Sequence, residues 1–129
     1  MESIENQIVN YLLLHKELTD WIGQRLYPLE LLEGTQLPAM VYSRISTTKN
    51  NRARNGKNNA PIIEFSVYAN RYSEIKAITE IFEHITDQVS LELPEFGLVT
   101  MFLENSRDLN ERDSNLKRQI IEIEVNYGN

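Results

Sequence analysis

Four closely spaced cations could bind an anionic partner: Lys49, Arg52, Arg54 and Lys57. They lie in the stretch TTKNNRARNGKNNAP, residues 47–61, which contains no acidic residue and no large apolar side chain. Lysine and arginine pair with carboxylates and phosphates, and the arginine fork does so through two parallel hydrogen bonds. Three interpretations remain open: a solvated tip, a contact with an acidic protein surface, or a contact with nucleic acid.

Outside this stretch the chain is acidic, because its net charge is −6 despite the four cations. A domain that binds nucleic acid broadly is expected to carry a basic face, and the composition argues against one. The basic stretch also lacks aromatic residues on which bases could stack. A protein contact is therefore favoured. A small nucleic-acid-binding module acting through residues 49–57 is kept as the alternative.

No other group of residues has the spacing of a catalytic or metal site. His15 and His84 fall on predicted helices, and neither has a second histidine four residues further along. Glu122 and Glu124 share one face of a predicted strand, and residues 107–115 lack the glycine and terminal glutamate of a calcium loop. The chain has no phosphate-binding glycine motif and no nucleophile elbow. We therefore predict no catalytic residue, no metal and no cofactor.

The composition is that of a globular protein. The chain has 129 residues, of which 41% are hydrophobic and 25% charged, and these values predict one domain over residues 1–129. It has no cysteine, which excludes a disulfide framework and a thiolate zinc site. No apolar run approaches about 18 residues, and the start, MESIENQIVNYLLL, has an acid where a signal peptide needs a base. We therefore expect a protein made in the cytosol, with no membrane partner.

Two amphipathic helices are predicted from apolar residues at steps of three and four. The first follows Ser3 as its N-cap and runs to about Leu18. The second is capped by Ser73 and covers residues 74–90. Residues 19–38 form an irregular connector rich in glycine and proline, with a short extended piece at "RLY". The apolar stripes consist of Ile4, Ile8, Tyr11 and Leu12 in the first helix and of Ile75, Ile78, Phe82, Ile85 and Val89 in the second.

Four strands are predicted where apolar residues alternate with polar ones. The first two strands form an antiparallel hairpin whose tip is a flexible basic loop at residues 48–60. The polar residues 106–115 form the connector between the last two strands. The strands cover residues 39–47, 62–70, 98–105 and 116–127, and their apolar faces include Ile63, Phe65, Val67, Ala69, Ile121, Ile123 and Val125.

This order of helix, strand, strand, helix, strand, strand predicts an α+β fold. Two helices pack on one face of a four-stranded, mainly antiparallel sheet, which gives two layers. The other face of the sheet is partly polar and open to water or to a partner. Trp21, Tyr27 and Tyr42 either pack the junction between helix and sheet or form a contact surface.

Three segments, taken in order, resemble the tail-completion, or tail-terminator, proteins of long-tailed bacteriophages. The segments are LTDWIGQRLYPLELLEGTQLPAMVYSRIS, EFSVYANRYSEIKAITEIFEHI and NLKRQIIEIEVNY, and together they cover most of the chain. The residues that carry the resemblance are Gly23, Arg25, Leu26, Tyr27 and Pro28, then Leu37, Pro38 and residues 41–45, then Val67 to Tyr72, and finally Arg118 before Ile120 to Tyr127. The connector LELLEG and the long basic hairpin tip depart from the pattern of the family.

The resemblance implies an α+β subunit that forms a ring, usually sixfold, at the end of the tail tube that faces the capsid. Such a ring stops polymerisation of the tube and offers a docking surface for the head-completion or neck protein. The implied partners are therefore other copies of the chain, the tail tube protein and the neck protein. The resemblance also implies a virion protein that has no enzymatic activity and no cofactor. Lys49, Arg52, Arg54 and Lys57 then become candidate contacts with an adjacent subunit or with the tube.

Overall fold

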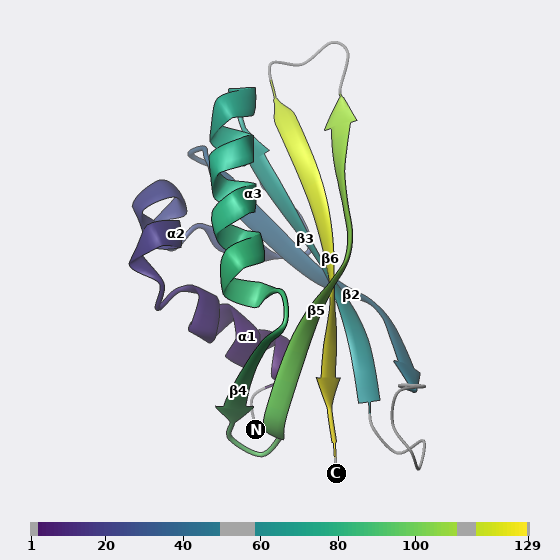
Figure 1. The fold of residues 1–129 in the computed structure, drawn as a ribbon. Coiled ribbons are helices and arrows are strands. Elements are labelled where there is room, and N and C mark those ends of the chain that lie inside the picture. The colour runs from purple at the N-terminus through teal and green to yellow at the C-terminus, as the bar shows by residue number, and fades with distance from the viewer. Residues whose placement is uncertain (1–2, 50–58, 111–115, 129) are drawn as a thin grey trace.

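A computed structural model describes residues 3–49, 59–110 and 116–128, which form an α+β fold with one layer of helices on one sheet (Figure 1). The predicted fold class is therefore confirmed, but the number of elements is larger than expected. The helices are α1 (Ile4–Leu12), α2 (Lys16–Ile22) and α3 (Tyr72–Thr86), and the strands are β1 (Leu26–Pro28), β2 (Ala39–Lys49), β3 (Asn59–Ala69), β4 (Val89–Leu93), β5 (Gly97–Asn110) and β6 (Lys117–Tyr127). None of the described helices is both long and apolar enough to span a bilayer.

The sheet has six strands in the order β1-β2-β3-β6-β5-β4, rather than the four that were predicted. Strand β1 runs parallel to β2, and all other neighbours are antiparallel, so the sheet is mixed. It is strongly curled and resembles half a barrel, with the three helices on the same face (Figure 1). The two additional strands, β1 and β4, are short, and they are the two edges of the sheet.

The predicted first helix is wrong in its length, because two helices replace it. Helix α1 ends at Leu12, the chain turns through residues 13–15, and His15 is the N-cap of α2. Leu18 lies in the second helix and is fully buried, as Leu12 is in the first. The apolar residues keep their spacing of three and four across the turn, as they would in one continuous helix. The sequence pattern therefore does not reveal the break. After the bend, α2 packs against α3.

The predicted second helix ends four residues early. Helix α3 begins at Tyr72 with Arg71, not Ser73, as its N-cap. It ends at Thr86 because Gln88 turns into the left-handed region with φ 60° and its N–H donates to the carbonyl oxygen of Met101 at 2.7 Å. Val89, which fits the helical stripe, is instead the first residue of β4. Pairing with β5 therefore overrides the helical period at this point.

Two predicted loops are shorter than expected. Strand β5 continues to Asn110 after a bulge between Leu103 and Asn105, so the polar residues 106–110 lie in the sheet and pair with β6. The sequence analysis assigned them to a loop because they are mainly polar, but here the polar side chains belong to an exposed part of the sheet. In the other hairpin, Lys49 pairs with Asn59, so both strands enter the predicted tip.

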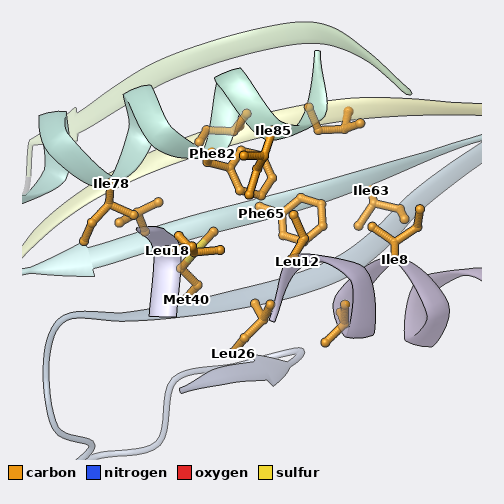
Figure 2. Close-up of a cluster of buried hydrophobic side chains, with 14 of the residues drawn as sticks. Ile8, Leu12, Leu18, Leu26, Met40, Ile63, Phe65, Ile78, Phe82 and Ile85 are labelled. Atoms are coloured by element: carbon orange, nitrogen blue, oxygen red, sulfur yellow. The ribbon is translucent and has the colours of Figure 1, made fainter. Parts of the chain in front are cut away.

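The core lies between the helices and the sheet (Figure 2). Phe65 is 1% exposed and its ring lies 4.8 Å from that of Phe82, which brings β3 and α3 together. Met40, Leu12 and Leu18 fill the space beside this pair (Figure 2). The predicted buried faces of the two central strands are confirmed, since Ile63, Phe65, Val67, Ala69, Ile121, Ile123 and Val125 are all buried.

Candidate interaction surfaces

Strand β2 ends, and β3 begins, at the lower end of the sheet in Figure 1. Lys49 is the last residue of β2, and its backbone pairs with Asn59 at the start of β3. Arg52, Arg54 and Lys57 lie outside the described residues. The role predicted for the four cations therefore stays a prediction.

The two histidines differ in their surroundings, and neither lies in a candidate site. The Nδ1–H of His15 donates to the carbonyl oxygen of Tyr11 at 3.0 Å, and the two rings pack edge to face at 4.6 Å. His84 is exposed in the last turn of α3. In the described part of the chain, no group of three or more histidine, aspartate and glutamate residues could hold a metal ion.

The glutamates of the open sheet face form ion pairs rather than a ligand set. Glu122 lies 3.3 Å from Arg107 of the neighbouring strand β5. Glu64 of β3 lies 3.7 Å from Arg118, whose guanidinium also donates to Ser66 Oγ at 3.0 Å. These cross-strand pairs are half-exposed, so they contribute modestly to stability and make this face polar.

Of the three aromatic residues singled out in the sequence, one packs between helix and sheet and two are exposed, as a contact surface requires. Tyr42 packs against the core, with its ring 6.4 Å from that of Phe65. Trp21 and Tyr27 are exposed, at 36% and 37%. Leu29, directly after β1, is 78% exposed and has φ 70°, a conformation that is unfavourable for a leucine. This edge of the sheet therefore presents an apolar surface to solvent, which is a feature of interaction sites.

A groove with a volume of about 570 Å³ lies at the opposite edge, between α1 and β4. Its lining is mainly apolar: Tyr11 and Leu14 come from the helix side, and Leu91 and Leu93 come from the strand. Leu14, in the turn between α1 and α2, is 83% exposed. We name this feature the α1–β4 groove. The sequence did not predict it, because the first two residues of β4 were assigned to a helix and the other three to no strand.

Two acidic residues, Glu92 and Glu95, also line the α1–β4 groove, and both are exposed. Glu95 lies in the turn between β4 and β5, where the N–H of Phe96 donates to the carbonyl oxygen of Leu93 at 3.1 Å. Pro94 precedes it, and Glu95 has φ 72°, as the third residue of a type II turn does. Glycine is favoured at that position, so the chain keeps a glutamate there at a conformational cost.

The exposed apolar edge at β1 and the α1–β4 groove are features of a protein that acts through contacts with other molecules. A chain of the structure described as "Virion of native gene transfer agent (GTA) particle" has the same fold, with a TM-score of 0.75 over 97% of this chain and 94% of that chain. Their sequences are only 11% identical, so this match shows the fold alone. A search of curated proteins gave no significant match.

The sequence itself matches a known family. The profile described as "Tail completion protein gp17" covers residues 6–128, and the chain therefore belongs to this family. The resemblance found from the sequence is confirmed. The protein is therefore a structural, non-enzymatic member of a family of tail completion proteins.

Proposed function

We propose that this protein forms a ring that ends the tail tube and joins it to the head or neck of the virion. The observation that carries the proposal is the family match over residues 6–128. A completion protein must stop the growth of a polymer and present a new surface to the next component. A closed ring of identical subunits does both, because its two faces differ and its circumference leaves no free end.

The fold supports a ring of this kind. Strands β1 and β4 are the opposite edges of the sheet, and in the described part of the chain neither is paired on its outer side. The exposed apolar residues near β1 and the α1–β4 groove lie at these different edges. Two unlike surfaces on opposite sides of a subunit give head-to-tail contacts, and such contacts close into a cyclic ring when the rotation permits. About six copies are expected from the resemblance to the family.

In this ring Lys49, Arg52, Arg54 and Lys57 contact carboxylates of an adjacent subunit or of the tube protein. The acidic remainder of the chain supplies such carboxylates on every copy. Arginine is suited to this role because its guanidinium binds a carboxylate through two hydrogen bonds. The same cations would contact phosphates if the chain were instead a nucleic-acid-binding module. In that case binding to duplex DNA would weaken steeply with salt.

The mass of the assembly tests the proposal. The purified protein is measured by light scattering and negative-stain electron microscopy, alone and after mixing with the tail tube protein. Closed rings of about six copies, or rings on one end of each tube, are the expected result. A protein that stays monomeric and leaves the tube ends bare would overturn the proposal. Duplex DNA replaces the tube protein as the probe for the alternative.

A further inference from the structure

We infer that the α1–β4 groove is the receptor for residues 50–58 of a neighbouring copy of this chain. This inference rests on the proposed ring and names one contact that would hold it together. The neighbour's segment contains Arg52, Arg54 and Lys57. Four properties of the groove carry the argument: its lining, its charge, its open strand edge and its place in the fold.

The lining of the groove suits the stems of arginine and lysine side chains. Tyr11, Leu14, Leu91 and Leu93 provide an apolar floor. Long cationic side chains lay their methylene groups on such surfaces while the charged ends stay in water. The segment brings no leucine, isoleucine, valine or aromatic residue of its own, so these stems are its main apolar material.

The charge of the groove selects a cationic occupant. Glu92 and Glu95 are the two acidic residues that line it, and the segment has three cations and no acid. Glu95 is the stronger indication, because its φ of 72° favours glycine over any charged residue. The turn thus holds a carboxylate in the groove although its backbone favours glycine.

The free edge of β4 offers backbone partners. This strand is the last in the sheet, and its outer N–H and C=O groups have no neighbouring strand in the described part of the chain. An extended segment can add to such an edge through main-chain hydrogen bonds. Close by, Gln7 donates to the carbonyl oxygen of Pro94 at 3.1 Å, while its Oε1 is buried and has no hydrogen-bond partner among the described residues. A donor from an incoming segment would satisfy that oxygen.

The place of the groove in the fold favours a neighbouring copy over the same chain. Strands β2 and β3, which carry the segment, are separated from β4 by β6 and β5. A segment of nine residues anchored at Lys49 and Asn59 reaches roughly 15 Å beyond that pair. The end of β2 and the start of β3, which flank the segment, lie at the lower end of the sheet in Figure 1. A contact from one copy to the next uses this reach and repeats around a ring.

The other candidate occupant is less suitable. Leu29 and Leu32 are 78% and 67% exposed in the connector after β1, and they could also enter an apolar groove. However, Glu30 and Glu33 accompany them. These carboxylates would face Glu92 and Glu95 of the groove, and like charges repel at an interface.

Site-directed cross-linking tests the inference, because the chain contains no cysteine that would interfere. One preparation carries Leu14→Cys, a second carries Asn55→Cys, and the two are mixed under ring-forming conditions with a short bis-maleimide reagent. A covalent dimer is expected. The matched control replaces the first preparation with Leu32→Cys, another exposed leucine, and no dimer is expected from it. A chain carrying both Leu14→Cys and Asn55→Cys reports a contact within one copy as a cross-linked monomer.

A charge variant gives a second measurement. Glu92→Gln with Glu95→Gln should raise the concentration at which half of the chain is assembled by about tenfold, with the same fold by circular dichroism. Glu17→Gln with Glu80→Gln removes the same charge from exposed positions of α2 and α3, outside both proposed contact surfaces, and should leave assembly unchanged. Rings that form without the Leu14–Asn55 dimer would overturn this inference and leave the proposed function standing. A chain that forms no ring, even with tube protein, would overturn both.

Discussion

The hydroxyl of Tyr11 donates a hydrogen bond of 2.7 Å to the carbonyl oxygen of Ile85. Ile85 lies in the last turn of α3, where backbone carbonyls have no partner within the helix. The bond therefore satisfies a helix end and ties α1 to α3 across 74 residues of sequence. The same tyrosine also lines the α1–β4 groove, so the element that shapes the groove is fixed to the core.

Replacing Tyr11 by phenylalanine tests this link. Tyr11→Phe keeps the ring but removes the donor, and we expect the free energy of unfolding to fall by about 1 kcal/mol. Urea denaturation followed by circular dichroism measures the change. Tyr27→Phe is the control, because Tyr27 is exposed and its hydroxyl should contribute little. Equal stability of Tyr11→Phe and the unchanged protein would show that water replaces the bond.

Alkaline pH should destabilise the fold through the same residue. Burial raises the pKa of Tyr11 above its ordinary value of 10.0, and burial followed by the charge of Glu5 raises the pKa of Tyr42. The unfolded chain then loses these protons at lower pH than the folded chain does. Their contribution to stability is complete below pH 10 and is lost as the pH rises through the folded-state values. Denaturation curves from pH 8 to pH 11 should show this fall, with a smaller slope for Tyr11→Phe.

Adding a charge to the core should unfold the protein, whereas removing the charges of the basic stretch should not. Phe65→Asp or Ile123→Asp places a carboxylate at a position that is at most 1% exposed, and we expect the fold to be lost. Neutralising Lys49, Arg52, Arg54 and Lys57 together with glutamine should leave the unfolding midpoint nearly unchanged. Thermal denaturation compares the variants. Unfolding of the neutralised variant would show that the stretch packs against its own domain.

The turn after α3 offers a stabilising substitution. Gln88 is exposed and has φ 60°, so Gln88→Gly relieves an unfavourable backbone conformation without removing a packed side chain. We expect a gain of about 0.5 to 1 kcal/mol in the free energy of unfolding. Glu80→Gly, at an exposed position inside α3, is the matched control and should cost about 1 kcal/mol. A loss at both positions would contradict the assignment of the turn at Gln88.

The fold could be predicted from the sequence where one period dominates. The apolar alternation around Phe65 and Ile123 identified the two central strands, and the stripe around Phe82 identified α3. The break near His15 left no signal, because the apolar residues keep the same helical phase on both sides. Val89 also fits the helical stripe, so only its pairing with Met101 of β5 places it in a strand. The three residues of β1 are too few to show a period.

The candidate surfaces were harder to predict than the fold. The basic stretch could be identified from the sequence, because its local composition of cations without acidic residues is sufficient to recognise it. The α1–β4 groove brings Leu14 beside Leu91 and Leu93, which lie far away in the sequence, and its strand was not recognised. Surfaces built from distant elements depend on the tertiary fold, and local patterns do not encode them. The one local signal was a proline before Glu95, which is typical of a turn.

The central ladder between β3 and β6 determines how this subunit responds to mechanical load. The ladder extends from Asn59 opposite Tyr127 to Ala69 opposite Lys117, and the hairpins that it joins point toward opposite ends of the molecule (Figure 1). Its hydrogen bonds lie perpendicular to the strands. A pull between the two ends would therefore load these bonds together in shear. Peeling β4 from the sheet edge would instead break the β4–β5 bonds one at a time. The subunit should therefore be stiffest along its strands.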